Sequence, residues 1–468
     1  GCTTISDKNG NLLFYTDGST AYDKSHNVMP NGSGLLGHRS STQSAIIVPK
    51  PNNPNLYYIF TVDEPNPYNA DDNDINDVDP PNNGLNYSLV DLRLNNGLGD
   101  IVSTEKNIPL ITYNKNNSEE VKFKCSEKVT AVQHGDGVSF WVITHFINTF
   151  YSFKVGTLGI DKNPVKTVTS FNIPIGGYNY NAIGYLKVSP NGRKLAMANS
   201  STRSTNELGP KNSVVRDTGN VLLFDFNSIT GIVSNGIKLI ENSNPYGLEF
   251  SAKSKKLYIT SNKYNNTGQT LGSELLQFDL KSSNIIGSKT IINSSVNSAG
   301  ALQLAIDEKI YRSGYPNTGM GGQTTKLSVI NNPELDGASS NYLQDAIDLK
   351  GRYSELGLPP FITSFFLYSF SYEFNCLGDT THFFINTTEK IDSVLWDFGD
   401  GTTSTDITAY HTYANPGDYT VTIIKSVNGE LREPLEKNVT IYDTPKILST
   451  PYKLIQCDTQ DSQPTDGL

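Results

Sequence analysis

The chain has few of the residues that build helices, cross membranes or carry strong charge. Only 18% of its 468 residues are charged, and it contains three Met and two Trp. No stretch reaches the roughly 20 consecutive apolar residues that a membrane-spanning helix needs, and no long window repeats apolar residues at helical spacing. We therefore expect neither a membrane span in this segment nor a helical bundle.

The chain also lacks a basic cluster and a recognisable catalytic motif. It carries 37 Lys and Arg against 47 Asp and Glu, which gives a net charge of −10. Nucleic-acid binding rests on clustered cations that neutralise phosphates, so we expect no nucleic-acid partner. The six histidines form no His-Glu-x-x-His pair, and there is neither a Gly-x-Ser-x-Gly elbow nor a phosphate-binding loop. We predict that the protein has no catalytic residues and is not an enzyme.

Cysteine is scarce and widely spaced. The four cysteines are Cys2, Cys125, Cys376 and Cys457, and no two are close enough in sequence to form a zinc knuckle. Two disulfides in any of three pairings are compatible with this spacing, and so are isolated thiols. The sequence leaves these alternatives open.

Polar turn formers and aromatic residues take the place of the missing charge. Asn, Ser and Thr are abundant, and the chain has 39 Gly, 25 Tyr and 20 Phe. Tyr and Phe favour strands, whereas Asn, Gly and Ser close turns. We therefore predict an all-β protein.

A unit with four strand-like segments recurs along the chain. Clear copies begin near residues 184, 245 and 300, and a period of about 50 residues with four strands is typical of a β-propeller blade. A single blade cannot bury both faces, whereas a closed ring of blades can. Six units are recognisable, and residues 358–366 could supply a closing strand. We predict a seven-bladed β-propeller over residues 1–373; an array of β-sandwiches or a solenoid is the alternative.

The rhythm of the sequence changes after Cys376, where shorter alternating strands begin. Trp396 alternates onto the inner face as a core aromatic residue. Asp397 and Asp400 can accept backbone N–H bonds in the loop that follows, and Gly399 permits a positive φ there. About seventy residues with this spacing suit an immunoglobulin-like β-sandwich.

This segment closely resembles the PKD domain family, named after the polycystic kidney disease protein. The resemblance rests on a Trp-Asp-Phe-Gly-Asp-Gly run and a His-Thr-Tyr…Pro-Gly-x-Tyr-Thr-Val run. It implies a rigid extracellular spacer or interaction module over residues 374–444, without catalysis, followed by a linker and the start of a truncated module over 445–468. The signature residues are Trp396, Asp397, Gly399, Asp400, Gly401, His411, Tyr413, Pro416, Gly417 and Tyr419.

Residues 5–18 and 40–49 are similar to a Bacteroidota family of large PKD-containing surface proteins. The resemblance implies export by type IX secretion, an extracellular or outer cell-surface location and, for many members, a link to gliding motility. The implied partners are an extracellular glycan or protein and, during export, the type IX secretion machinery.

An acidic run is the sharpest electrostatic feature. It holds five carboxylates in nine residues, and hard oxygen ligands at alternating positions suit Ca²⁺. The run departs from the EF-hand pattern because it has no Gly at the sixth position and no Glu at the twelfth. A solvated loop is the alternative, and calcium is the one cofactor that the sequence suggests. The candidate ligands are Asp71, Asp72, Asp74, Asp77 and Asp79.

These features favour a non-enzymatic, adhesin-like surface protein that binds a glycan or protein. Long loops rich in Tyr, Asn, Ser and Gly, at residues 64–84, 201–219, 263–273 and 312–325, suit adaptable polar recognition. One alternative is a propeller enzyme acting on polysaccharide, which needs convergent carboxylates. Another is a structural subunit of a secretion or motility complex.

Overall fold

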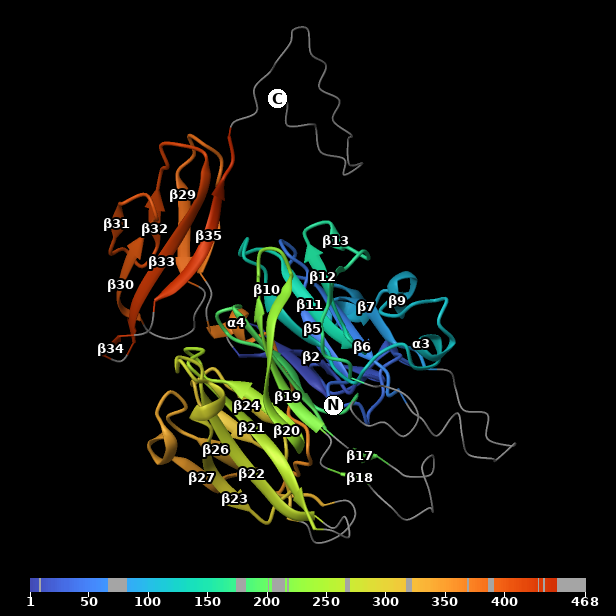
Figure 1. Ribbon diagram of the computed structural model, residues 1–468. Coiled ribbons are helices and arrows are strands. Elements are labelled where there is room, and N and C mark those ends of the chain that lie inside the picture. Colours follow the sequence, from blue (N-terminus) through green and yellow to red (C-terminus); the bar gives the residue numbers. More distant parts are fainter. Residues whose placement is uncertain are drawn as a thin grey trace.

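The computed structural model describes most of the chain. The described residues are 1–7, 10–65, 82–173, 182–200, 202–203, 215–216, 219–265, 270–316, 322–367, 370–385, 391–427, 429–431 and 434–443. Strands dominate these residues, which confirms the all-β prediction (Figure 1). The helices among them are short: α2 (Leu94–Gly97), α3 (Ser118–Phe123) and α4 (Thr363–Leu367).

Three antiparallel sheets form the first part of the chain, and each is built from consecutive strands. The first contains β1 (Thr3–Ser6), β2 (Leu12–Thr16), β3 (Thr20–Asp23) and β4 (Val28–Ser33). The second contains β5 (Ala45–Pro49), β6 (Leu56–Val62), β7 (Leu85–Asp91), β8 (Asp100–Ile101) and β9 (Ile108–Leu110). The third contains β10 (Thr130–Gln133), β11 (Phe140–Phe146), β12 (Thr149–Gly156), β13 (Gly159–Ile160) and β14 (Val165–Val168).

Three further sheets follow in the same order. The fourth contains β15 (Leu186–Val188), β16 (Lys194–Asn199), β19 (Gly219–Phe226) and the first part of β20 (Val233–Phe250). The end of β20 begins the fifth sheet, which continues with β21 (Lys256–Tyr264), β22 (Thr270–Asp279) and β23 (Thr290–Ser295). The sixth contains β24 (Leu302–Leu304), β25 (Ile310–Arg312), β26 (Lys326–Ile330) and β27 (Tyr342–Asp348), and β17 (Thr202–Arg203) pairs with β18 (Val215–Arg216) beside the fourth.

Each of these six sheets packs its face on the next one, and we call them together the six-sheet body. Strand β11 shows why, because all seven of its residues are buried. Phe140 and Val142 pack in the core shared with the second sheet, while Trp141 and Ile143 alternate into the core shared with the fourth. Side chains on successive strand positions point to opposite faces, so a strand that is apolar throughout needs a partner on both sides.

The sequence prediction of a closing strand at residues 358–366 is wrong. This stretch runs as irregular chain through Ile362 and then forms the short helix α4. Pro359 and Pro360 explain the difference, because proline has no N–H to donate to a ladder. In addition, β1 already belongs to a complete sheet with β2, β3 and β4. Apart from the two-stranded sheet of β17 and β18, the described residues thus form six sheets before α4, and a seventh sheet of four or more strands is not among them.

The stretch from Leu356 to Phe365, which we call the axial segment, instead connects the inner edges of several sheets. The first strands of neighbouring sheets contact one another, and the segment bonds to residues at or beside them. Ile362 packs into the core between the second and third sheets. The bonds are Ala301 N to Leu356 O (2.8 Å), Thr3 Oγ1 to Pro360 O (2.8 Å), and Gln133 N to Ser364 Oγ (3.0 Å).

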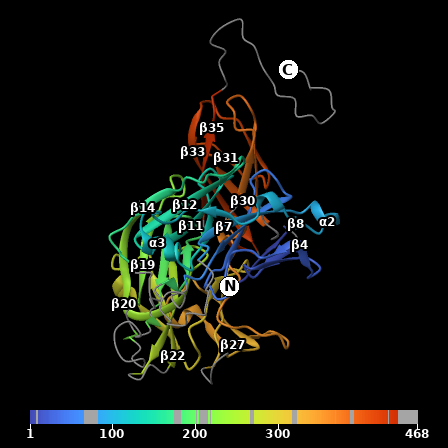
Figure 2. The same ribbon diagram turned by 90° about the vertical axis from the view of Figure 1, so that its right-hand side faces the viewer.

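Two facing sheets form the C-terminal sandwich, in agreement with the predicted immunoglobulin-like module. One contains β28 (Phe370–Glu373), β29 (Thr381–Ile385) and β32 (Ala409–His411). The other contains β30 (Ile391–Asp397), β31 (Thr403–Ser404), β33 (Gly417–Val427), β34 (Glu430–Leu431) and β35 (Leu435–Ile441). Figures 1 and 2 both show this sandwich above the six-sheet body, with β22 and β27 toward the opposite end.

The axial segment should contribute strongly to stability. Ile362 is 1% exposed, so we expect Ile362→Ala to lower the free energy of unfolding by about 2–5 kcal/mol. The matched control is Ile306→Ala, because Ile306 is 61% exposed and its loss should change stability by less than about 0.5 kcal/mol. Urea denaturation followed by circular dichroism measures both. Equal, small effects would show that the segment is not part of the core.

Candidate binding surfaces

The predicted signature residues of the C-terminal sandwich come together around its core. Trp396 is fully buried, and its indole Nε1 donates to the Asp406 carbonyl at 2.9 Å. Its ring meets Phe370 edge to face, with centroids 5.1 Å apart. Trp396 therefore fills the space between the two sheets, as its alternation in the sequence predicted.

The aspartates of the signature hold the loop that follows. Asp397 Oδ1 accepts from Gly399 N at 2.9 Å, and Asp400 Oδ1 accepts from Thr402 N at 3.1 Å. The other oxygen of Asp400 lies 2.7 Å from His411 Nε2. Burial raises the pKa of Asp400, but the hydrogen bonds from Thr402 and His411 outweigh it, so the net shift is downward.

The remaining signature residues close the same region. Gly399 and Gly401 have φ of 78° and 89°, and a Cβ on Gly399 would lie 2.6 Å from the Thr420 carbonyl oxygen. Tyr413 donates its hydroxyl to the Phe398 carbonyl at 3.1 Å. Its ring lies 4.2 Å from that of Tyr419, in the strand that Gly417 begins after Pro416. The aspartates, His411 and the aromatic residues of the signature thus make structural contacts in the described sandwich.

Buried polar side chains lie where the first strands of the fourth, fifth and sixth sheets meet. The Lys187 ammonium donates to Glu249 Oε2 at 2.8 Å and to Gln303 Oε1 at 2.7 Å. Lys187 and Glu249 are 4% and 0% exposed. The Glu249 carboxylate also accepts from the backbone N–H groups of Phe250 and Leu304. These three side chains neutralise and bond one another, which fits a structural network better than an open catalytic site.

Our sequence analysis did not identify this network, although a signal was present. The three first strands read Leu-Lys-Val, Leu-Glu-Phe and Leu-Gln-Leu, so one polar residue interrupts an apolar strand at the same place in three units. An isolated polar position inside a buried strand requires a partner. Because this polar position recurs in three first strands, the three polar residues are expected to bond with one another.

A second buried cluster joins the beginnings of β5 and β10 to β15. Glu127 is buried and accepts from both Thr42 N (2.9 Å) and Thr42 Oγ1 (2.8 Å). Burial raises the pKa of Glu127 despite these bonds, and it lowers the pKa of the adjacent Lys128. The Gln43 amide bonds both the N–H (2.8 Å) and the carbonyl (3.0 Å) of Leu186, as a neighbouring strand would.

The first strands all begin at one end of the six-sheet body, which we call the loop end. Contacts between these beginnings show it: Gly1 N to Ser41 O (3.0 Å), Thr42 to Glu127, Gly184 N to Thr42 Oγ1 (3.1 Å), and Tyr185 N to Tyr246 O (3.0 Å). In an antiparallel sheet, the second strand ends where the first begins. The four long predicted loops follow the second strands β6, β16, β21 and β25, and the last residues of these strands lie at this end. Much of each loop lies outside the described residues.

Two exposed apolar residues lie at the loop end of the fifth sheet. Leu271 and Val296 are 60% and 70% exposed. Ser273 pairs with Ser295 across β22 and β23, and a Cβ on Gly272 would lie 3.0 Å from Val296 Cα, so Val296 lies opposite Gly272, the residue after Leu271. We take these two side chains as candidate ligand contacts at this end.

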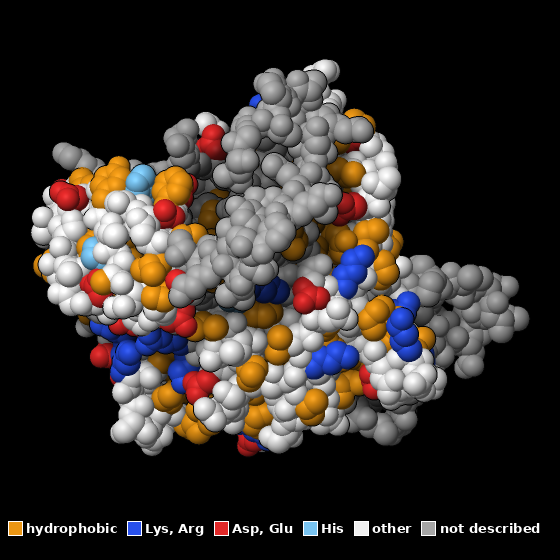
Figure 3. Space-filling view, turned by 90° about the horizontal axis from the view of Figure 1, so that it is seen from above, with side chains coloured by type: hydrophobic (Ala, Val, Ile, Leu, Met, Phe, Trp, Pro, Cys, Tyr) orange, Lys and Arg blue, Asp and Glu red, His pale blue; other side chains and the backbone are white. Residues whose placement is uncertain are grey.

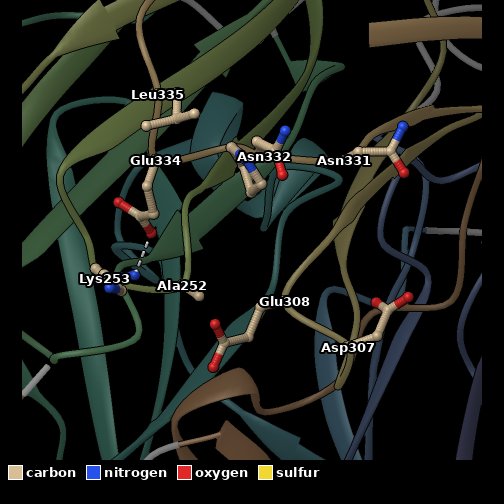
Figure 4. Close-up of a pocket in the computed structure, with 9 residues that line it drawn as sticks. Ala252, Lys253, Asp307, Glu308, Asn331, Asn332, Glu334 and Leu335 are labelled. Atoms are coloured by element: carbon tan, nitrogen blue, oxygen red, sulfur yellow. Dashed lines mark hydrogen bonds between the residues drawn. The ribbon is translucent and has the colours of Figure 1, made fainter. Parts of the chain in front are cut away.

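One polar pocket of about 350 Å³ lies elsewhere, between turns of the fifth and sixth sheets (Figure 4). Three carboxylates line it. Glu334 accepts from Lys253 N at 2.5 Å and from Ser251 Oγ, and burial raises its pKa. Figure 4 shows the Asp307 and Glu308 carboxylates pointing in different directions from the turn that follows β24. The three groups do not converge on one point as a catalytic pair does.

The predicted calcium ligands, Asp71, Asp72, Asp74, Asp77 and Asp79, lie outside the described residues, so this site stays a prediction. Within the part that the structure describes, no group of three or more His, Cys, Asp or Glu is placed to hold a metal ion. Cys2, Cys125 and Cys376 are free thiols, and Cys457 lies outside this part. No described helix has the length and apolar character that crossing a membrane requires.

Residues 375–439 match the family model of the PKD domain, so the C-terminal sandwich is a PKD domain. This confirms the prediction for that region. No curated protein matches the chain.

Several solved structures are similar to parts of the chain. The PKD1 domain of Vibrio anguillarum Epp is 20% identical and covers 16% of this chain and 93% of its own, with a TM-score of 0.15. The extracellular domain of a putative one component system from B. thetaiotaomicron is 12% identical and covers 94% of this chain and 50% of its own, with a TM-score of 0.34. Kuenenia stuttgartiensis hydrazine synthase is 13% identical and covers 87% and 92%, with a TM-score of 0.38. At these values the similarities assign no function to this chain.

The Lys187–Glu249 pair yields a test by double substitution. Glu249→Leu leaves a buried ammonium without its counter-charge, and we expect it to lower the free energy of unfolding by about 3–5 kcal/mol. Adding Lys187→Met removes that charge and should restore part of the loss. Urea denaturation of the three variants measures the coupling. A double variant whose loss equals the sum of the single losses would contradict a coupled pair.

Asp400 should make the PKD domain sensitive to acid. Its pKa is lower in the folded domain than in the unfolded chain, so it stabilises the fold above the unfolded pKa of about 3.9. This contribution is lost as the pH falls through the folded pKa. We therefore expect Asp400→Asn to destabilise the domain at neutral pH and to have a smaller effect near pH 3. Fluorescence of Trp396 reports unfolding in a Trp141→Phe background, and the exposed Asp379, replaced by Asn, is the control.

Proposed function

We propose that this protein is a non-enzymatic extracellular binding protein that recognises a glycan or a protein through the loop end of the six-sheet body. In this proposal the six sheets act as a propeller-like ring filled by the axial segment, and the PKD domain is attached at the other end. The finer assignment, a type IX-secreted surface protein of the outer cell surface with a role in gliding motility, rests on the sequence resemblance alone.

The observation that carries this proposal is that the second strands before the four long connections all end at the loop end. Loops grouped on a rigid scaffold are where proteins most often place recognition residues. The exposed pair Leu271 and Val296 lies at the same end and adds an apolar contact area to polar surroundings. The extracellular setting is supported by the PKD domain at residues 375–439.

The buried centre supports binding over catalysis. Propeller enzymes would need convergent reactive groups in an open central pocket. Here the first strands of the sheets are bonded to the axial segment, and the side chains of Lys187, Glu249 and Gln303 on these strands are bonded to one another. The alternative is an enzyme that acts on polysaccharide. One observation favours it, namely the acidic pocket lined by Asp307, Glu308 and Glu334.

Screening of the whole chain against arrays of extracellular glycans and surface proteins tests the proposal. Once a ligand is found, we expect the pair Leu271→Glu and Val296→Glu to weaken its binding at least about tenfold, which is about 1.4 kcal/mol. The control is Leu158→Glu, because Leu158 is fully exposed in the β12–β13 turn at the opposite end.

The same assay separates the rival reading. Release of products from a polysaccharide, abolished by Glu308→Gln but not by the Leu271 and Val296 substitutions, would replace the binding proposal with an enzyme. Equal loss of binding in the Leu158 control would remove the loop end as the binding surface.

A further inference from the structure

The PKD domain contacts the turn between β10 and β11 through two side chains from different strands. The Tyr372 hydroxyl, from β28, donates to the Asp136 carbonyl at 2.8 Å, and burial raises the pKa of that tyrosine. The Lys437 side chain, from β35, lies directly over Gly137. A Cβ on Gly137 would lie 2.5 Å from Lys437 Cδ and 2.8 Å from its Nζ. A side chain at this position would have to displace the end of the Lys437 side chain, and the φ of 74° at Gly137 favours glycine independently.

The ammonium of Lys437 is held by Phe370 of the same PKD domain. It donates to the Phe370 carbonyl and lies 4.9 Å from the centre of the Phe370 ring. Burial lowers the pKa of Lys437 to about 8, although the Asp136 carboxylate acts in the opposite direction. Enclosing an ammonium is costly unless its bonds are satisfied, so the contact is specific in geometry and not a loose surface encounter.

Two more contacts surround this centre. At the edge of the contact, Arg193 Nη2 lies 2.6 Å from Glu436 Oε2. Both side chains are largely exposed, so this ion pair alone adds little to the free energy of the contact. The axial segment leads by the chain into the PKD domain. Just before it does so, it packs on the six-sheet body, where the centroids of the Phe365 and Phe140 rings lie 5.5 Å apart. Figure 3 shows acidic and basic side chains together along the border between the PKD domain, at the left, and the six-sheet body.

We propose that the PKD domain is locked to the six-sheet body through the Tyr372, Lys437 and Gly137 contact, so that both move as one rigid unit in solution. The turns that it touches, 134–139 and 189–193, join first to second strands and therefore lie opposite the loop end. One consequence rests on the proposed function: the lock directs the binding end away from whatever follows the PKD domain.

Distance measurements on the whole chain test the lock without any ligand, so its failure and that of the proposed function are distinguishable. Genetically encoded spin labels at the exposed positions Leu158 and Ile407 should give one narrow distance distribution. Gly137→Val should broaden that distribution about twofold or more, because domains without a firm interface move relative to one another by default. The matched control is Gly97→Val, since Gly97 has a φ of 82° and open space around a Cβ.

Tyr372→Phe keeps the test valid if the valine variants fold poorly, because it removes only one hydroxyl. We expect it to broaden the distribution less than Gly137→Val does, with unchanged circular dichroism. A broad distribution in the unaltered chain, or a distribution that none of the Gly137 and Tyr372 changes affects, would overturn the proposal.

Discussion

The six-sheet body depends on the burial of both faces of its inner strands. Strands such as β11 are buried at every residue, and alternate positions feed two different cores. No sheet of this kind is stable alone, because one apolar face would remain in water. Each sheet therefore requires the next, and the axial segment supplies apolar contacts where the first strands meet, with Ile362 in the core beside the second and third sheets.

The predictable parts of this structure are those encoded by residues close together in sequence. The PKD signature from Trp396 to Tyr419 forms its loop and core contacts within one small domain, and the recurring strand pattern identified six units correctly. The predicted closing strand does not form, because Pro359 and Pro360 have no N–H to donate to a strand ladder. Our prediction gave more weight to the apolar residues of this stretch than to these two prolines. The network of Lys187, Glu249 and Gln303 was missed, because Lys187 is 62 and 116 residues from its partners and its only sequence signal is a polar position that recurs in three first strands.

The same non-local packing separates the two ends of the molecule. One end carries the second-to-third connections, which vary in length and include the longest in the body. The other carries short turns, and one of them, at Gly137, receives Lys437 of the PKD domain. A turn that must accommodate a neighbouring domain cannot lengthen freely, whereas a connection that faces solvent can. The PKD domain can therefore pack on the body while the loops vary in length only if the PKD contact and the loops lie at opposite ends of the body.

This division bears on the choice between binding and catalysis. The buried ion pair costs desolvation energy, but its side chains bond groups from the first strands of three sheets, so replacing it with an open reactive site would remove contacts among all three. The pocket near Glu334 avoids that problem, but its carboxylates point apart and one is already bonded to Lys253 N and Ser251. The loop end is the surface where new side chains can be added without disturbing either the core or the PKD contact, and this favours recognition there.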